Sequence, residues 1–354
     1  MAYTTINKGS DYFNTKTYTG NATTDTAQTG IGFQPDWLWI KERGGTGSHI
    51  LVDAVRGAGA EKEISPNGTA GMGDNDNEVY GYISSFDSDG FSVTGSSNSS
   101  YFNQSSETYV NWYWKANGQG SANYDGSINT TYTSANTTAG ISIIKYNGNG
   151  SNGATIGHGL GVAPKLVMIK RTDTTSNWIV GEAVLGFNKF SYLNEQDTAT
   201  TNAGPFNDTA PSSSVITLGT WNDVNNSSGT YICYAFAKIA GFSDFGTYTG
   251  NGNADGPFVY TGFKPAFVMV KNTSASNNWF IQDNLRAGYN ASNYLLKPNT
   301  NGAEDTGTHI DIYSNGFKTR VNSSNCNGSG NIMTYIAFAG APLVGSNNIP
   351  ATAR

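Results

Sequence analysis

One sequence motif occurs three times in this chain with constant internal spacing. In each copy a Pro lies 3 residues, a Lys 9 residues and an acidic residue 21 residues after a Gly, and the copies start at Gly32, Gly161 and Gly262. Chance does not place four residue types at identical offsets three times, so the chain is an internal repeat. The repeat constrains the fold strongly, because each copy must form a similar unit.

The copies extend beyond this motif in both directions. A Tyr-x-Gly triplet precedes each motif, at Tyr18, Tyr146 and Tyr248, and an alternating, aromatic-rich run closes each copy. One unit therefore spans about 100 residues, which is a domain size and too long for a solenoid repeat. We predict a lead-in, a first unit, a linker or added hairpin, a second unit, a third unit and a tail, at residues 1–11, 12–120, 121–140, 141–240, 241–344 and 345–354.

The apolar run that follows the Pro of each motif predicts a strand. Residues 36–40 are nearly continuously apolar, and Pro35 and Gly44 bound them, which is typical of a short strand buried on both faces. Turn residues separate such runs at intervals of about 8 to 15 residues, and no helical period is present. We predict an all-β fold of three tandem antiparallel β-sandwich units, jelly-roll or lectin-like. The segments 36–41, 165–170 and 266–271 should superpose.

Large apolar residues of the repeated strands are the candidate core, because aromatic side chains dominate the apolar area that a core buries. We expect the following side chains to be buried: Trp37, Trp39, Val167, Ile169, Trp178, Val268, Val270, Trp279, Tyr234 and Phe338.

Composition excludes two classes of partner. Charged residues make up 13% of the chain, and the net charge is −6. Phosphate binding needs clustered Lys and Arg, and the 20 basic residues are scattered, so we expect no nucleic-acid partner. No run approaches the roughly 20 apolar residues of a spanning helix, so we expect no membrane insertion. The first residues also lack the apolar core of a secretory signal.

Four segments, 32–41, 85–91, 157–164 and 248–263, carry a resemblance to a known family. With them the chain resembles β-rich proteins encoded by tailed bacteriophages of marine bacteria and cyanobacteria, over residues 11–354. The resemblance implies a virion structural, tail-fibre or capsid-associated protein, assembled in the host cytoplasm, with other virion proteins as partners. Together with the polar, weakly charged surface, it favours a homo-oligomer and in particular a trimer. It transfers no catalytic or binding residue.

The repeated Lys and acid are interpreted as structural. Lys41 and Asp53 recur in every unit, and residues present in all copies usually serve the fold, so we expect each Lys and acid to pair across strands or to cap a turn. A Ca²⁺ ligand is the alternative for these acids. The acidic segments 74–78 and 87–90 have the oxygen-rich composition that Ca²⁺ prefers, but neither has EF-hand spacing, and we interpret both as turns.

No pattern in the sequence predicts an enzyme, a metal or a cofactor. The GxGxxG match at 148–153 is followed by further turn residues rather than a helix, which indicates a hairpin loop. The three His residues occupy unrelated positions, and no GxSxG is present. Cys233 and Cys326 do not correspond between units, so we expect two unpaired thiols. No acid pair unique to one unit points to polysaccharide hydrolysis.

Aromatic residues in loops are the remaining functional signal, and Asn, Ser and Gly surround them. Aromatic faces with amide side chains suit a sugar ring, and the same composition suits a wet protein interface. The chain is therefore expected to be an adhesion module for a host-surface glycan or protein, or alternatively a capsid decoration or other purely structural virion protein. The candidate ligand-binding residues are Tyr101, Phe102, Tyr289 and Tyr294.

Overall fold

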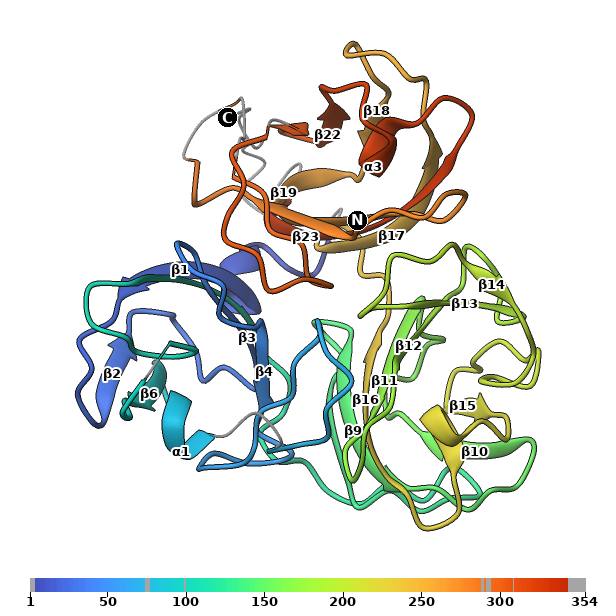
Figure 1. Cartoon of the computed structure of the whole chain (residues 1–354). Coiled ribbons are helices and arrows are strands. Elements are labelled where there is room, and N and C mark those ends of the chain that lie inside the picture. Colours follow the sequence, from blue (N-terminus) through green and yellow to red (C-terminus); the bar gives the residue numbers. More distant parts are fainter. Residues whose placement is uncertain are drawn as a thin grey trace.

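The structure is a computed structural model that describes residues 4–73, 77–98, 100–287, 290, 294–307 and 309–342. Three β-rich units lie around a common centre (Figure 1). The helices within this part of the chain are single turns: η1 (Gly9–Asp11), α1 (Asn77–Tyr80), α2 (Asn222–Asn225) and α3 (Ser324–Asn327). None of these helices is long and apolar enough to span a bilayer.

The first unit is a sandwich of two antiparallel sheets. The larger sheet has the order β1-β7-β3-β4, and the smaller sheet has the order β2-β6-β5. The strands are β1 (Phe13–Thr19), β2 (Thr26–Thr29), β3 (Trp37–Glu42), β4 (Ile50–Asp53), β5 (Tyr82–Asp87), β6 (Gly90–Thr94) and β7 (Thr108–Trp114).

The second unit repeats this order with additions at both edges. Its large sheet runs β14-β13-β12-β11-β16-β9-β8, and β10 pairs with β15 in the small sheet. Part of the segment expected to be a linker or hairpin forms β8, which extends the large sheet. The strands are β8 (Tyr132–Asn136), β9 (Ile141–Asn147), β10 (Ala154–Gly157), β11 (Leu166–Arg171), β12 (Trp178–Glu182), β13 (Lys189–Tyr192), β14 (Thr200–Thr201), β15 (Val215–Leu218) and β16 (Thr230–Phe236).

The third unit returns to the pattern of the first. Its sheets have the orders β17-β23-β19-β20 and β18-β22-β21. Its strands are β17 (Ser243–Thr249), β18 (Phe258–Tyr260), β19 (Phe263–Asn272), β20 (Phe280–Asp283), β21 (Ile310–Tyr313), β22 (Gly316–Thr319) and β23 (Ile332–Pro342).

The predicted all-β, antiparallel fold is confirmed. The three segments expected to superpose lie in β3, β11 and β19, and each of these strands sits between its closing strand and its hairpin partner: β7-β3-β4, β16-β11-β12 and β23-β19-β20. The repeated motif therefore builds the same central strand in each unit.

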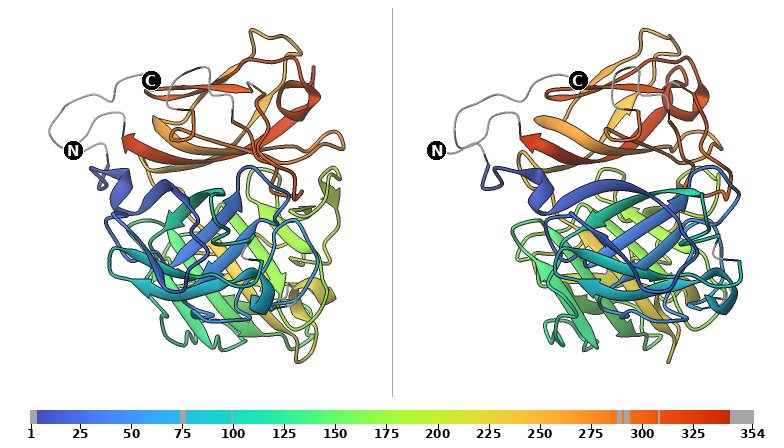
Figure 2. Two further views of the ribbon diagram at one scale, coloured as in Figure 1. Left: turned by 60° about the vertical axis from the view of Figure 1, so that its left-hand side comes forward. Right: turned by 90° about the vertical axis from the view of Figure 1, so that its left-hand side faces the viewer.

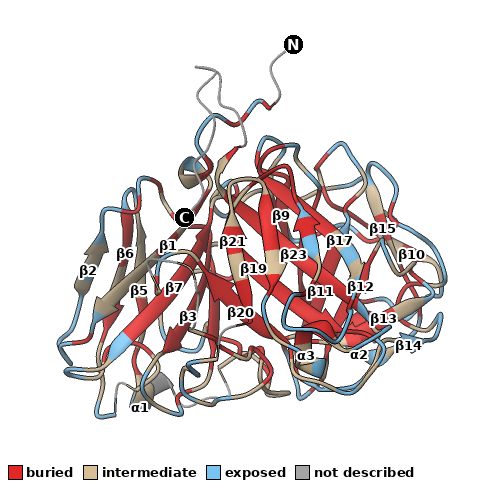
Figure 3. Ribbon diagram, turned by 90° about the horizontal axis from the view of Figure 1, so that it is seen from above, coloured by how far each residue is buried: buried red, intermediate tan, exposed pale blue. Residues whose placement is uncertain are grey.

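These central strands are buried on both faces, as their continuous apolar character predicts. All residues of β3 are buried, and successive residues enter different cores. Leu38 and Ile40 face the sandwich core of the first unit, whereas Trp37 and Trp39 face a cluster that draws residues from all three units. Side chains alternate across a strand, so one motif fills two cores. Figure 3 shows this buried central part of the strands and the exposed loops around it.

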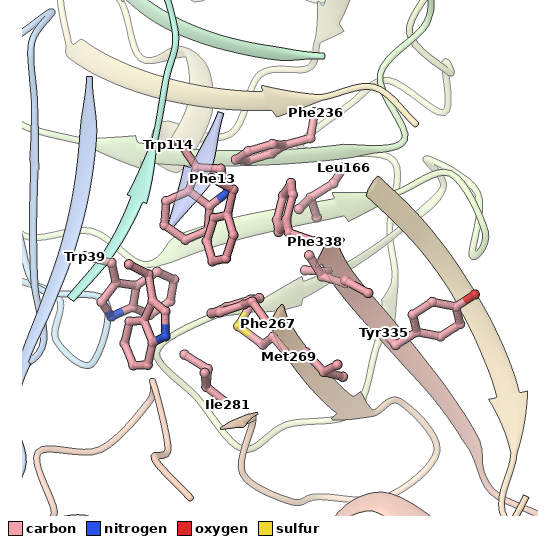
Figure 4. Packing of buried hydrophobic residues seen from close by; sticks show 14 of the residues in the cluster. Phe13, Trp39, Trp114, Leu166, Phe236, Phe267, Met269, Ile281, Tyr335 and Phe338 are labelled. Atoms are coloured by element: carbon pink, nitrogen blue, oxygen red, sulfur yellow. The ribbon is translucent and has the colours of Figure 1, made fainter. Parts of the chain in front are cut away.

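The three large sheets turn their inner faces toward one another at the centre of the molecule (Figures 1 and 4). Trp37, Leu166 and Phe267 hold equivalent positions there, each opposite an aromatic residue of the closing strand. The predicted core residues are all at most 2% exposed. The third unit rests on the other two (Figure 2), so the chain has a three-fold arrangement within itself.

Candidate functional site

The repeated acid of each unit reaches the next unit around the centre. Asp53 Oδ2 accepts hydrogen bonds from Arg56 Nε at 2.6 Å and from the Tyr234 hydroxyl, in the second unit, at 2.7 Å. Asp283 of the third unit accepts from Trp112 Nε1, in the first unit, at 3.2 Å. The first and third acids therefore hold neighbouring units together and do not form a ligand site.

The acid of the second unit lacks the arginine partner. Glu182 is buried and interacts with Thr334 of the third unit, and Leu185 stands where the other two units have arginine. Burial raises the pKa of Glu182 to about 7, and the interaction with Thr334 opposes this shift. Glu182 therefore places a titratable carboxyl group between the second and third units.

The repeated Lys and acid do not pair with each other, but the alternative expectation, that they cap turns, is confirmed. Asp53 and Asp283 Oδ1 accept from the backbone N of Arg56 and Arg286, three residues later, at 2.8 and 2.9 Å. The register places Trp37 opposite Asp53, so Lys41 lies at the other end of its strand. Each Lys instead donates to a carbonyl of its own β-hairpin turn, and burial lowers the pKa of Lys41 and Lys271 to about 8. The acceptors for Lys41, Lys170 and Lys271 are the carbonyls of Gly45, Ser176 and Asn277, respectively, at 3.1, 3.0 and 2.5 Å.

A repeated buried Asn, which the sequence analysis missed, ties a loop to each sandwich. Asn225 accepts from Asn149 N at 2.9 Å and donates to the carbonyls of Ser151 and Gly219, both at 2.9 Å. The equivalent Asn of the other units makes the same contact with the residue after its Tyr-x-Gly triplet. These pairs are Asn103 with Asn21 N at 3.0 Å and Asn327 with Asn251 N at 2.9 Å.

This repeated Asn explains the position of Phe102. The residue before it is buried in every unit, as Phe102, Val224 and Cys326, and Phe102 is 0% exposed. Its ring packs in the core of the first unit and is not at the surface, so Phe102 is not available to a ligand. A constant spacing to the closing strand, six residues from Asn103 to Tyr109 as from Asn225 to Tyr231, is the signal that would have found it.

The other candidate aromatic residues lie apart in the fold. Tyr289 is outside the described residues. Tyr294 is half-buried, and the Arg43 guanidinium lies 5.4 Å from its ring centre. Arg43 in turn forms an ion pair with Glu304 at 2.7 Å, which joins the first and third units. Tyr294 is thus part of a contact between units.

Tyr101 lies in a hollow of the first unit with a volume of about 390 Å³. Its ring stacks on that of Tyr80 with 4.1 Å between centres and 23° between planes. Burial raises the pKa of Tyr101, so its hydroxyl keeps its proton and can donate a hydrogen bond. The hollow is lined by Glu42, Gly45, Thr46, Gly47, Tyr80, Asn98, Ser100, Tyr101 and Gln104.

A buried carboxylate lines the same hollow. Glu42 is 5% exposed, and its Oε2 accepts from Gly47 N at 3.0 Å. A Cβ on Gly47 would lie 2.7 Å from that oxygen, so the turn needs glycine here to admit the carboxylate. The equivalent residues are Arg171 and Asn272 in the other units, where Arg171 pairs with an acid and Asn272 caps a turn. The carboxylate-lined hollow is therefore particular to the first unit.

The described residues contain no group of His, Cys, Asp and Glu side chains that could hold a metal ion. Asp89, in one of the acidic segments, lies in the turn between β5 and β6, as expected. Its carboxylate accepts from Gly30 N at 2.9 Å and Gly32 N at 2.6 Å, in the loop that follows β2. Residues 74–76 of the other segment lie outside the described part. Cys233 and Cys326 are buried free thiols, as expected. The glycine-rich loop 148–153 joins β9 to β10 without a helix.

A comparison with known proteins identifies a family without a known role. A family model described as "Domain of unknown function (DUF7483)" matches residues 8–342. No curated protein and no solved structure matches the chain. Because the matched region covers most of its length, the chain belongs to the DUF7483 family.

Proposed function

We propose that this member of the DUF7483 family is a non-enzymatic virion protein of a tailed phage that recognises a host-surface glycan through the hollow at Tyr101. The resemblance to phage proteins supports the virion part of the proposal. The hollow supports the glycan part, because it combines a stacked Tyr pair with the Glu42 carboxylate. Concave sites that bind small polar ligands combine aromatic walls with a few placed polar groups.

The chemistry of the hollow matches that of a sugar ring. The face of an aromatic ring carries negative charge, so the Tyr101 wall attracts the polarised C–H bonds of a pyranose. The Glu42 carboxylate accepts from Gly47 N and has further acceptor capacity for a sugar hydroxyl, and the Asn98 and Gln104 amides both donate and accept. An anionic ligand fits less well, because Glu42 would repel it.

The non-enzymatic part of the proposal rests on the acids. Glycoside hydrolysis uses two carboxyl groups, about 5 to 10 Å apart. Among the described residues that line the hollow, Glu42 is the one acid. Release of reducing sugars from host polysaccharide by the purified protein would overturn this part.

Three variants of the hollow test the glycan site. Tyr101→Ala removes the stacking face, Tyr101→Phe keeps the face and removes the hydroxyl, and Glu42→Gln removes the negative charge. We expect glycan binding, found on a host-glycan array and measured by calorimetry, to weaken about tenfold or more for Tyr101→Ala. Tyr101→Phe should bind better than Tyr101→Ala. The control is Tyr124→Ala, because Tyr124 is 72% exposed and lies on a different unit.

The same variants in virions separate adhesion from assembly. Host adsorption lost by particles of normal stability would support the adhesion module. Fragile particles with normal adsorption would instead support a structural role. Unchanged binding and adsorption for Tyr101→Ala would rule out the hollow as the receptor site.

A purely structural virion protein, such as a capsid decoration, is the second candidate. The three-fold arrangement within one chain favours it, because such a body suits a three-fold position on a particle. We also propose self-assembly with a trimer favoured, which a stable monomer in light scattering at micromolar concentration would contradict. Calibrated mass spectrometry of copies per particle distinguishes the roles, since decoration proteins occur in large multiples and fibres in few.

A further inference from the structure

The small sheet of the third unit presents aromatic rings to solvent. Strand β18 has its two outer residues exposed, Phe258 at 46% and Tyr260 at 55%, while Val259 between them is buried. Tyr313 of β21 is half-buried on the same outer face. Large exposed aromatic residues that cluster on one face mark an interaction site.

Register joins these side chains into one continuous surface. Tyr260 lies opposite Gly316, and Gly316 lies opposite Tyr313, so the two Tyr residues flank a glycine in one row across the sheet. A Cβ on Gly316 would lie 3.0 Å from Phe258 Cζ, so the Phe258 ring covers the glycine. The Phe258 and Tyr313 ring centres are 5.8 Å apart with 86° between the ring planes, so the two rings meet edge to face. At the usual strand spacing the row extends roughly 10 Å, about the length of two linked sugar rings.

The same sheet positions in the first unit show that the fold does not require these rings. Gly90 of the first unit is equivalent to Gly316, and its neighbours across the sheet are Thr29 and Asp87. Ala27 takes the place of Phe258. The first unit therefore forms the same three strands with Ala, Thr and Asp where the third unit has three aromatic residues. Their presence in one copy alone points to a role outside the fold.

The charges beside the rings neutralise one another. Lys318 Nζ lies 2.6 Å from Asp255 Oδ1, and Arg320 Nε lies 3.2 Å from Asp311 Oδ2. These ion pairs leave hydrogen-bonding groups at the edge of the rings without excess charge of either sign. Such a surface complements a ligand that is rich in hydroxyl groups and uncharged, and it offers nothing to the phosphates of a nucleic acid.

We propose that Phe258, Tyr260 and Tyr313 form a second binding site, which takes a neutral polysaccharide chain lying across the outer face of β18-β22-β21. Sugar rings stack their C–H faces on the aromatic rings, and their hydroxyl groups reach the ion-paired side chains at the edge. The open row of rings suits a stretch of chain, with the perpendicular Phe258 and Tyr313 rings offering faces in two directions, whereas the hollow at Tyr101 is a more enclosed site. The two sites lie on different units and bind independently.

The first unit provides the test variant. The double substitution Phe258→Ala with Tyr260→Thr places in the third unit the residue types that the first unit has at the equivalent positions, Ala27 and Thr29. Native affinity electrophoresis in gels with dextran, hydroxyethylcellulose or xylan, and with anionic alginate as a comparison, measures binding. We expect a neutral polymer to retard the wild-type protein, and the double variant to bind it about tenfold more weakly or worse. Tyr124→Ala should be retarded like the wild type, because Tyr124 belongs to neither proposed site.

A thermal unfolding midpoint equal to that of the wild type shows that the double variant is folded. If the double variant is not folded, the single variant Tyr260→Ala takes its place in the test. Three results would overturn the site. The first is that the neutral polymers do not retard the wild type, and the second is that they retard the folded variant equally. The third is that light scattering shows self-association of the wild type but not of the variant, which would assign the surface to a second copy of the chain. Loss of binding in Tyr101→Ala alone would count for the hollow and against the second site.

Discussion

At the scale of single residues, Glu182 should make stability depend on pH. Its folded-state pKa is raised to about 7, so the folded protein holds this proton more tightly than the unfolded chain does. The stabilisation that the protonated carboxyl contributes is fully present below the pKa of Glu in the unfolded chain, about 4.3. It is lost as the pH rises toward 7, which lowers the free energy of unfolding by up to about 3 kcal/mol. Urea unfolding at pH 4.5 and 7.5 should show this loss in the wild type, and Glu182→Gln should remove it.

Leu185→Arg provides a second variant for Glu182, because it copies the arginine that follows Asp53 and Asp283. A cation beside the carboxylate favours its charged form. We expect this variant to lose less stability between pH 4.5 and 7.5 than the wild type. An identical pH dependence in the wild type and Glu182→Gln would show that Glu182 does not titrate in this range.

Trp279 should contribute strongly to stability, as its place in the repeated motif predicts. It is 1% exposed, and its Nε1 donates to the Tyr192 carbonyl of the second unit at 2.9 Å. Trp279→Ala removes a large buried side chain and leaves that carbonyl unpaired, so the free energy of unfolding should fall by about 3 to 5 kcal/mol. Urea denaturation measures it, with Tyr124→Ala as the exposed control. A loss below about 1 kcal/mol would mean that the pocket collapses fully.

At the scale of elements, the repeat predicted the central strands, whereas several other strands carry no such signal. Continuous apolar runs with a fixed Pro and Lys identify β3, β11 and β19, because burial on both faces leaves a strong pattern. Strands β13 and β22 carry short, mixed sequences such as Lys-Phe-Ser-Tyr and Gly-Phe-Lys-Thr, in which neighbours across the sheet decide the conformation. Local sequence does not report such neighbours.

The candidate site was predictable to a similar degree. Tyr101 stood out as an aromatic residue in a polar loop, and it does line a hollow. Phe102, its neighbour, looked the same in sequence, but it occupies the core position before a repeated Asn. Glu42 was not predicted, since it directly follows the repeated Lys and belongs by sequence to the strand. Which side of a turn faces solvent depends on packing between distant segments.

The repeated Asn gives a prediction at this scale. Asn225 is 0% exposed, and its side chain bonds to four backbone groups of the loops that it joins. Asn225→Ala leaves these groups without their partner, so we expect a loss of about 2 to 4 kcal/mol in unfolding free energy. Asn226→Ala is the matched control, because Asn226 is the next residue and its side-chain amide donates a hydrogen bond to Asn222 at the exposed surface. Equal effects of the two substitutions would contradict the role of Asn225.

At the scale of the whole molecule, contacts between units close into a ring. Trp178 Nε1 donates to the Ser65 carbonyl of the first unit at 2.9 Å, as Trp279 does to the second unit. His49 holds the equivalent position in the first unit, and its ring approaches the Lys297 backbone of the third without standard hydrogen-bond geometry. Each unit thus inserts a ring side chain into the unit before it, with the first following the third. The inner faces of the three units are buried against one another within a single chain. A homo-trimer would therefore have to form through the outer surfaces of the units.

This closure predicts that no unit is independent. Alone, residues 121–240 would expose the inner face of their large sheet, where Leu166, Met168 and Phe236 contribute to the shared cluster. An apolar face of that size drives association or prevents folding. We therefore expect the isolated fragment to be unfolded or associated at micromolar concentration, by circular dichroism and by size-exclusion chromatography with light scattering, under conditions in which the full chain unfolds cooperatively. A monomeric fragment with a cooperative transition of its own would show instead that each sandwich core suffices, and that the shared centre only arranges the units.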